Sequence, residues 1–135
     1  LVDSQKMSKS LGNFYTLRDL LEMGYSPESI RYLLASVPYR NKLNFTFDGL
    51  KAAQTAVDRL RNYALRLRTA KFAEGENPDW TAKAQSSAIR FGEALDDDIN
   101  TAGALGVIFE FIRDSNAAMD AGTFLAGNVP AAEDL

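Results

Sequence analysis

Two lysines three residues apart, Lys6 and Lys9, lie in a short segment of small and hydroxyl-bearing residues near the start of the chain. Each lysine ammonium group carries a full positive charge and three hydrogen-bond donors, so two of them on one flexible loop can close on a polyphosphate. Ser8 and Ser10 add hydroxyl donors, and Gly12 permits left-handed backbone conformations that cost other residues about 1–2 kcal/mol. A solvated loop without a ligand is the alternative, and the K-x-x-K spacing alone favours that alternative.

The composition limits what else the chain can do. Its 135 residues include no cysteine and no histidine, which excludes disulfides, thiolate nucleophiles, imidazole bases and Cys/His zinc sites within the chain. Any chemistry must use Lys, Arg, Asp, Glu or hydroxyl side chains. No apolar run approaches the roughly 20 residues of a transmembrane helix, which predicts a soluble, cytoplasmic protein. The chain does not begin with methionine, so we expect it to be a piece of a longer protein.

Charge is distributed unevenly along the chain. The net charge of -3 hides a basic first part, residues 1–74, with 12 Lys and Arg against 7 Asp and Glu, and an acidic remainder with 3 against 11. A basic part suits a polyanionic partner and an acidic part repels one. Solvated helix faces that bind nothing are the alternative, and composition alone favours them.

Two short helices are predicted directly after the lysines. Thr16 is a candidate N-cap with Asp19 three residues later, and Gly24 ends this first helix. Ser26 caps the second helix, which has Pro27 at its first position. The apolar residues expected to face the core are Leu17, Leu20, Leu21, Ile30, Leu33, Leu34 and Val37.

Three longer helices are predicted from apolar residues spaced by three and four. The first is expected from Phe47 to about Glu74, and Gly75 interrupts it. Asn100 or Thr101 is expected to cap the last of the three. The apolar stripes are Leu50, Ala53, Val57, Leu60, Ala64 and Leu67 on the first helix, Ala84, Ala88, Phe91 and Leu95 on the second, and Leu105, Ile108, Phe109, Ile112 and Met119 on the third.

The predicted fold is therefore mainly α, with a loop and two short helices followed by an antiparallel bundle of three helices, because stripes this narrow need partner helices. Trp80 is expected to be a packing anchor at a helix start. Only residues 1–2 and 43–46 have a strand-like composition, and both segments are short. The residues after Gly122 are too few and too mixed in character for an assignment.

The segment Lys6 to Asn13, KMSKSLGN, resembles the KMSKS loop of class I aminoacyl-tRNA synthetases. The longer segment from Lys6 to Thr46, KMSKSLGNFYTLRDLLEMGYSPESIRYLLASVPYRNKLNFT, is similar to cysteinyl-tRNA synthetase. LDDDINTAGAL, which begins at Leu95, is similar to the acid-rich turn and the following helix of the DALR-type domain of these enzymes. The chain departs from the family at Pro38, where histidine is common, and at Asn41–Lys42, where a Ser-Pro pair is frequent.

The resemblance implies a division of the chain. Residues 1–46 correspond to the KMSKS loop and the stem-contact region, residues 47–121 to a DALR-type helical bundle, and residues 122–135 to a tail that starts a further C-terminal element. The resemblance also implies the activity of the parent enzyme, a ligase that activates cysteine with ATP and transfers it to tRNA(Cys).

The same resemblance implies roles for individual residues. Lys9 matches the second lysine of the motif and Lys6 the first, and these two are the expected catalytic residues. The expected ATP contacts are Lys6, Met7, Ser8, Lys9 and Ser10, with Met7 holding the loop to its neighbour by packing. The residues expected to contact the tRNA backbone are Arg31, Arg40 and Lys42.

ATP with Mg²⁺, cysteine and tRNA(Cys) are the expected ligands of the parent enzyme, which is expected to be a monomer. The family's His-Ile-Gly-His motif and its zinc site for the cysteine thiol require histidine and cysteine, which this chain lacks. The zinc is therefore expected elsewhere in the parent enzyme, and the chain alone is expected to be inactive. No metal site is expected in the chain.

Asp96, Asp97 and Asp98 raise the question of a magnesium site. Neighbouring residues on a helix point about 100° apart, so the three carboxylates cannot converge on one ion, and helix capping and salt bridges are favoured.

Two other functions stay open on these residues. A paralogous ligase activates cysteine with the same loop and delivers it to an amino-sugar. A non-catalytic helical module that binds RNA or a protein would have no need of the lysines.

Overall fold

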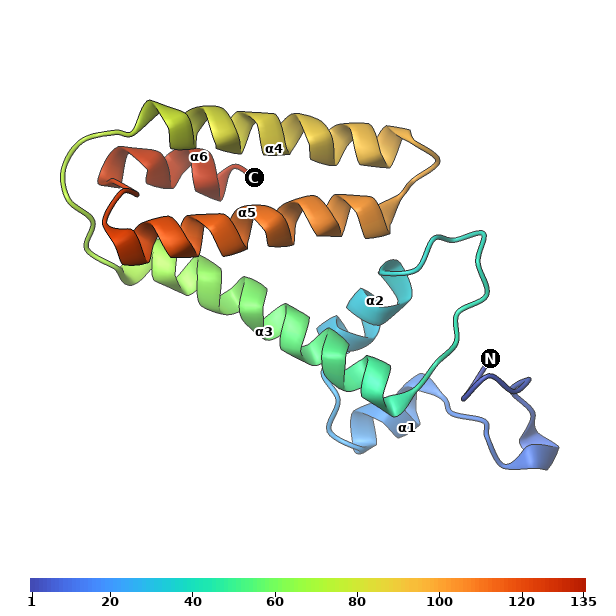
Figure 1. Cartoon of the computed structure of the whole chain (residues 1–135). Coiled ribbons are helices and arrows are strands. Elements are labelled where there is room, and N and C mark those ends of the chain that lie inside the picture. The colour runs from blue at the N-terminus through green and yellow to red at the C-terminus, as the bar shows by residue number, and fades with distance from the viewer. The chain divides into compact units, whose positions relative to one another are not determined.

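The computed structural model describes residues 1–135 and contains six α-helices and no β-strand (Figure 1). The chain forms two compact units, Leu1–Leu60 and Arg61–Leu135, and α3 begins in the first and ends in the second. The helices are α1 (Leu17–Glu22), α2 (Pro27–Ala35), α3 (Phe47–Thr69), α4 (Pro78–Asp96), α5 (Thr101–Ala121) and α6 (Val129–Glu133), with 3-10 turns η1 (Lys9–Leu11) and η2 (Ala126–Asn128). The prediction of a mainly helical fold is confirmed.

Side-chain caps begin the two short helices of the first unit as predicted. The Asp19 backbone N–H donates to Thr16 Oγ1 at 3.2 Å, and the Thr16 N–H donates to Asp19 Oδ2 at 2.7 Å, which completes a capping box. Hydrogen bonds to the Asp19 carboxyl from the Thr16 backbone N–H and then from the Thr16 side chain lower the pKa of this carboxyl. Ser26 accepts from the Ser29 N–H at 3.2 Å, and Pro27 is the first residue of α2.

The core of the first unit gathers apolar side chains from α1, α2, the start of α3 and the segments around Val2 and Phe45. The buried residues of this core are Val2, Leu20, Ile30, Leu33, Phe45, Leu50 and Ala53. The two strand-like segments meet here: Val2 and Phe45 form a single parallel bridge, in which the Asp3 N–H donates to the Phe45 carbonyl at 3.0 Å. The contact is thus one isolated bridge rather than a pair of strands.

Three apolar residues expected in this core lie at the surface instead. Leu17 is 58% exposed, Leu21 41% and Leu34 60%. The reason is the shortness of the helices: α1 has six residues and buries only Leu20, and α2 buries Ile30 and Leu33 on one face. The prediction of the buried stripe was therefore too wide on both helices.

In the second unit, α4 and α5 run antiparallel and the last turns of α3 pack on α5 (Figure 1). The buried apolar residues of this unit are Tyr63, Leu67, Ala84, Ala104, Val107, Phe111, Ile112, Ala118, Phe124 and Ala132. Trp80 lies 6.3 Å from Phe111 and 6.1 Å from Phe124, measured between ring centroids. Trp80 is therefore a packing residue, as predicted.

The stripes predicted on α4 and α5 are partly wrong. On α4, Ser87 is buried at 4% exposure whereas Ala88 is exposed. On α5, the fully buried face includes Val107 and Phe111, while most of the predicted stripe is only half-buried. The buried face of α5 is offset by about one residue from the predicted stripe, whereas Ala84 of α4 is buried as predicted, so helical spacing alone did not determine which residues are buried most deeply.

The third helix ends at Thr69, five residues before the predicted end. Beyond it the chain turns to meet the C-terminal residues: the Ala126 N–H donates to the Ala73 carbonyl at 3.0 Å, and the Gly127 N–H donates to the Gly75 carbonyl at 2.8 Å. Phe72 packs on Phe124 at 5.3 Å. The apolar spacing could not reveal this pairing, which satisfies the carbonyls of Ala73 and Gly75 with partners from the C-terminal residues.

The C-terminal residues, left without an assignment by the sequence, form η2 and α6 around a buried asparagine. Asn128 is 1% exposed, and its Oδ1 accepts from the backbone N–H of Asn77 (3.2 Å) and of Leu125 (3.1 Å). Its Nδ2 donates to the Asn77 carbonyl at 2.8 Å and to Thr81 Oγ1 at 3.2 Å. All of its side-chain polar atoms are hydrogen-bonded, which makes its burial favourable.

Candidate functional site

The segment Lys6–Asn13, called here the lysine loop, is a compact turn. Residues 9–11 form the 3-10 turn η1, and Gly12, in the left-handed conformation at φ 68°, ends it by donating its N–H to the Lys9 carbonyl at 3.2 Å. The hydroxyl oxygens of Ser8 and Ser10 lie 2.7 Å apart. Gly12 therefore adopts the left-handed conformation that the sequence analysis expected glycine to permit at this position.

Both lysines of this loop point into solvent. Lys6 and Lys9 are exposed, and neither ammonium group is paired with a carboxylate. The Lys9 Nζ lies 5.4 Å from the centroid of the Phe14 ring, a cation–π distance. Two cations without counter-charges on one loop are available to an anionic ligand.

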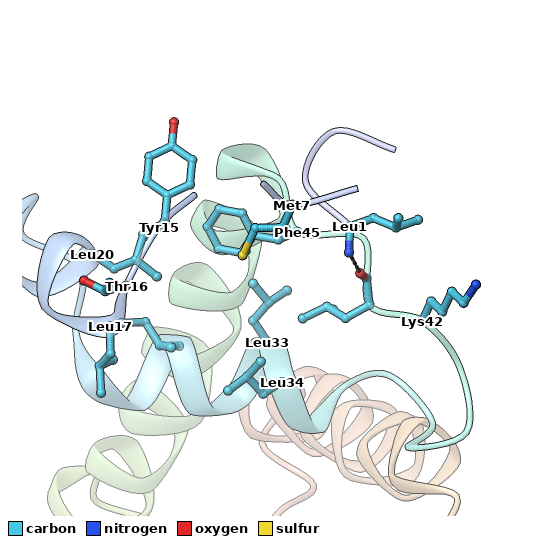
Figure 2. A pocket seen from close by; sticks show the side chains of 12 residues that line it. Leu1, Met7, Tyr15, Thr16, Leu17, Leu20, Leu33, Leu34, Lys42 and Phe45 are labelled. Carbon is cyan, nitrogen blue, oxygen red and sulfur yellow. Dashed lines mark hydrogen bonds between the residues drawn. The ribbon is translucent and has the colours of Figure 1, made fainter. Parts of the chain in front are cut away.

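An apolar groove of about 510 Å³ lies next to this loop in the first unit (Figure 2). Met7 lines the groove, and so do Leu17 and Leu34, two of the exposed leucines of the short helices. Lys42 is the charged residue among the lining side chains. The groove suits apolar side chains rather than phosphates, and Met7 of the loop lines it together with residues of α1 and α2.

The three residues predicted to contact tRNA are all exposed in the first unit. Arg31 is on α2, and Arg40 and Lys42 lie in the segment between α2 and α3. The Arg40 guanidinium carbon lies 5.3 Å from the centroid of the Tyr39 ring. Their positions leave all three side chains accessible from solvent.

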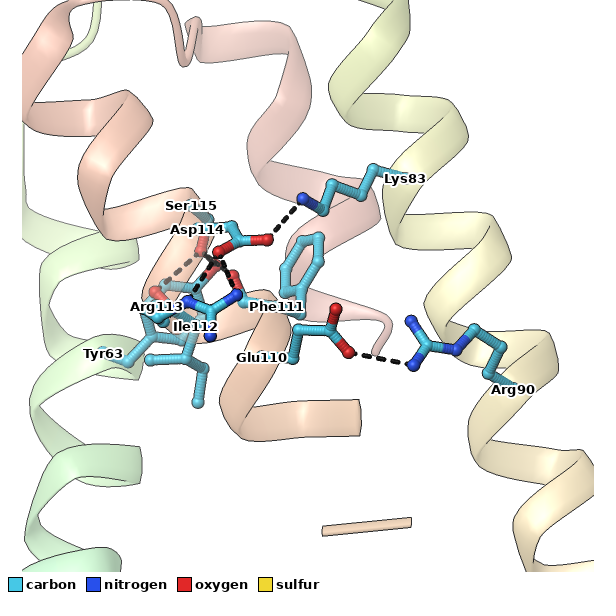
Figure 3. Close-up of polar contacts among 9 residues, drawn as sticks. All are labelled: Tyr63, Lys83, Arg90, Glu110, Phe111, Ile112, Arg113, Asp114 and Ser115. Atoms are coloured by element: carbon cyan, nitrogen blue, oxygen red, sulfur yellow. Dashed lines mark hydrogen bonds and ion pairs between the residues drawn. The ribbon is translucent and has the colours of Figure 1, made fainter. Parts of the chain in front are cut away.

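Several basic side chains of the second unit, by contrast, are paired with acidic ones. Arg66 donates to Asn116 Oδ1 at 2.8 Å and forms an ion pair with Asp120. Lys83 forms an ion pair with Asp114, and Arg90 Nη2 lies 2.9 Å from Glu110 Oε2 (Figure 3). A carboxylate of the acidic part therefore neutralises Arg66, a cation of the basic part.

The Asp114 carboxylate also accepts from Arg113, at 2.8 Å. Hydrogen bonds from Lys83 and then from Arg113 lower the pKa of this carboxyl. The Lys83 Nζ lies 5.1 Å from the centroid of the Trp80 ring as well. This cluster joins α4 to α5, and its charges pair with one another within the bundle.

No group of three or more Asp or Glu side chains is placed to hold a metal ion. The acidic residues 96–98 lie where α4 ends and the chain turns: Asp97 is the C-cap of α4, and Asp98 is left-handed at φ 53°. Asn100 caps α5 by accepting from the Gly103 N–H at 2.9 Å, as one of the two predicted caps.

One residue of the lysine loop was missed by sequence reasoning. Asn13 Oδ1 accepts from the Ser8 N–H at 2.8 Å, and its Nδ2 donates to the Lys6 carbonyl at 3.2 Å. The signal was an asparagine directly after Gly12, a residue type whose side chain often bonds to nearby backbone. The sequence did not indicate which backbone groups it would reach.

Two family models match the chain. Residues 1–55 match the tRNA synthetases class I (C) catalytic domain, and residues 90–132 match the DALR domain. The first of these models covers the lysine loop, and the second covers parts of α4 and α6 and the whole of α5. These matches, with the helical fold and the lysine loop, define a class I aminoacyl-tRNA synthetase segment.

The chain is 58% identical over 132 residues, 98% of its length, to the cysteine–tRNA ligase of Solibacter usitatus. It is 57% identical over 96% of its length to that of Koribacter versatilis, and 42% identical over 89% to that of Brachyspira hyodysenteriae. It belongs to the cysteine–tRNA ligase family, as the resemblance predicted, and it spans 28%, 26% and 26% of the length of these three relatives. None of its helices has the length and hydropathy that a bilayer-spanning segment requires.

Proposed function

We propose that the lysine loop is one half of the ATP site of a cysteine–tRNA ligase, with Lys9 and Lys6 as its catalytic residues. The observation that carries this proposal is the contrast between these two lysines and the bundle cations. Lys6 and Lys9 are exposed and unpaired, whereas Lys83 and Arg90 each face a carboxylate. Cations without counter-charges cost little to bring to a triphosphate because no existing ion pair has to be broken.

The reaction proposed for the whole ligase begins with attack of the cysteine carboxylate on the α-phosphorus of ATP, and pyrophosphate leaves with the bonding electron pair. Negative charge grows on the departing phosphates, so ammonium groups placed beside them stabilise the transition state more than the ground state. Ser8 and Ser10 would add hydroxyl donors, and Mg²⁺ would arrive with the nucleotide. The aminoacyl group then passes to the terminal ribose of tRNA(Cys).

Met7 has the supporting role in this proposal. It lines the apolar groove beside α1 and α2, and its side chain is 38% exposed. Contact between Met7 and the leucines of the groove would fix the loop at its first lysine without using either cation. The domain boundaries predicted from the resemblance, at residues 46 and 121, stay part of the proposal.

The remaining parts of the reaction are assigned to the rest of the ligase. A zinc site for the cysteine thiol needs thiolate or imidazole ligands, and this chain has none. We therefore expect no adenylation by the 135-residue chain alone. The whole ligase is proposed to be a cytoplasmic monomer, where ATP, cysteine and tRNA are all at hand.

Contacts with tRNA are proposed for Arg31, Arg40 and Lys42. They are exposed cations in the first unit, and the segment that carries two of them leads from α2 into α3. Cations of this kind bind phosphates and set the position of the nucleic acid without reading its sequence. Delivery of cysteine to tRNA(Cys), and not to an amino-sugar, is tested by offering each acceptor to the ligase.

The test of the catalytic proposal is ATP–pyrophosphate exchange by the full-length ligase that contains this segment. Lys9→Ala is expected to lower the exchange rate by about 100-fold or more, the size typical for loss of one preorganised electrostatic contact. Lys71→Ala, which removes an exposed lysine outside the loop, is the matched control and should leave exchange unchanged. Full exchange in Lys9→Ala would favour a non-catalytic helical module instead.

A further inference from the structure

The lysine loop is closed by one side chain that forms two hydrogen bonds across it. Asn13 Oδ1 accepts from the Ser8 N–H at 2.8 Å, and Asn13 Nδ2 donates to the Lys6 carbonyl at 3.2 Å. The two backbone groups lie on either side of Met7. We propose that Asn13 is a positioning residue that holds the backbone of the lysine loop so that both lysines face the same ligand.

The rest of the loop has little that could replace this clamp. Ser8 is the N-cap of η1, but its side chain makes no capping hydrogen bond and lies against the Ser10 hydroxyl. The remaining backbone bonds, Leu11 N–H to the Ser8 carbonyl (3.3 Å) and Gly12 N–H to the Lys9 carbonyl (3.2 Å), are local to the turn. Only Asn13 connects the turn to the backbone that carries Lys6.

The burial of this side chain agrees with a structural link. Asn13 is half-buried, whereas Leu11 and Gly12 directly before it are exposed. A carboxamide is the smallest side chain that offers both a carbonyl acceptor and an N–H donor on one planar group. The Asn13→Asp substitution would keep the acceptor for Ser8 but lose the donor for Lys6, and Asn13→Ala would lose both.

The consequence for the reaction rests on the proposed function of the loop. Lys6 and Lys9 are exposed, so their ammonium groups reach a triphosphate together only if the backbone between them is already ordered. Binding of ATP and stabilisation of the transition state cost less conformational entropy when the loop is already ordered before ATP arrives. Asn13 would act through the lysines, without touching the nucleotide.

The first arm of the test uses the 135-residue chain and needs no activity. NMR measures the hydrogen exchange of the Ser8 amide in Asn13→Ala and Asn13→Asp. Since one hydrogen bond changes an opening equilibrium by about three- to tenfold, Asn13→Ala should speed this exchange by that factor, while Asn13→Asp should keep most of the protection. Trypsin cleavage after Lys6 and Lys9 should quicken in Asn13→Ala as well.

A matched control for this arm lies in the same unit. Asn44 makes an equivalent pair of bonds to Ser4, accepting from its N–H at 2.7 Å and donating to its Oγ at 3.3 Å. Asn44→Ala should leave the Ser8 amide and the two cleavage sites unchanged. Unchanged Ser8 exchange in Asn13→Ala, or equal acceleration in Asn44→Ala, would overturn the clamp.

The second arm measures ATP–pyrophosphate exchange by the full-length ligase. Asn13→Ala should lower kcat/KM for ATP by about tenfold, from the loss of two ordinary hydrogen bonds, and leave KM for cysteine unchanged. An equal kcat/KM, or a loss shared by both substrates, would refute a positioning role. If Lys9→Ala also keeps full exchange, the proposed function fails, whereas the amide measurements still decide whether Asn13 holds the loop.

Discussion

The hydroxyl oxygens of Tyr63 and Ser115 lie 2.9 Å apart in the interior of the second unit, where they join α3 to α5 (Figure 3). Ser115 is fully buried, and its Oγ also lies 2.8 Å from the Phe111 carbonyl of its own helix. A serine hydroxyl has one proton but accepts as well, so Ser115 can bond to both partners at once when Tyr63 donates to it.

Removal of the serine hydroxyl should destabilise the bundle more than removal of the tyrosine hydroxyl. Ser115→Ala leaves the buried Tyr63 hydroxyl without a partner, which we expect to lower the free energy of unfolding by about 1–3 kcal/mol. Tyr63→Phe leaves Ser115 bonded to the Phe111 carbonyl, so its cost should be about 1 kcal/mol. Urea denaturation of both variants measures the difference, and the reverse order would contradict the proposed hydrogen-bond arrangement.

High pH should weaken the second unit through Tyr63. Burial raises the pKa of this phenol above its ordinary value of 10.0, and the positive charge of Arg66 opposes the rise only in part. The neutral phenol is favoured in the folded state. Its contribution to the free energy of unfolding is therefore complete below pH 10 and is lost as the pH rises through the folded-state pKa. In thermal melts, Tyr63→Phe should lose less stability than the wild type between neutral and strongly alkaline pH.

Low pH should weaken the same unit through Asp114. Hydrogen bonds from Lys83 and Arg113 lower the pKa of this carboxyl below its ordinary value of 3.8. The contribution of the ionised carboxylate to the stability of the fold is therefore fully present above that pH. It is lost as pH falls through the folded-state pKa. Asp114→Asn should cost about 1 kcal/mol at neutral pH, because the pair is partly exposed, and should flatten the acid side of the stability curve.

The control for the acid side is Asp134→Asn, which changes an exposed carboxyl after α6. Its melting temperature should follow that of the wild type at every pH. If the melting temperature of Asp114→Asn falls toward low pH as steeply as that of the wild type, the ion pair with Lys83 does not contribute to the pH dependence of stability.

Two glycine substitutions in the second unit should have opposite effects. A Cβ on Gly127 would lie 2.9 Å from the Gly75 carbonyl oxygen and from the Glu76 Cβ, so Gly127→Ala should disrupt the pairing that ends α3, at a cost of about 1–3 kcal/mol. Gly106 lies within α5 with open space around its Cβ position, and Gly106→Ala should stabilise by about 0.5–1 kcal/mol. The denaturant concentration at the midpoint of unfolding, compared with that of the wild type, should fall for Gly127→Ala and rise for Gly106→Ala.

Salt dependence should identify the tRNA contacts of the whole ligase. Each phosphate contact that is lost should reduce the slope of log K against log salt concentration by about 0.7–0.9. Arg31→Ala and Lys42→Ala should each produce such a change, whereas Arg66→Ala should not, because Arg66 is already paired with Asp120. Unchanged slopes for both first-unit variants would remove these residues from the tRNA interface.

Local patterns predicted the helix starts well. Thr16 with Asp19, Ser26 before Pro27, and Asn100 all cap helices through bonds to residues three positions later, and such bonds need no distant partner. The family was evident from the segment that contains the lysine loop for a similar reason, because a run of residues identifies a relative without reference to its folded contacts.

The sequence by itself therefore determined the helical class, the caps, the family and the two exposed lysines of the loop. Tertiary structure decided where α3 ends, because the carbonyls of Ala73 and Gly75 find their partners some fifty residues later, at Ala126 and Gly127. It also decided which helix faces are buried most deeply. Asn13 belongs with these: its residue type was visible, but its two acceptor and donor partners exist only once the loop has closed.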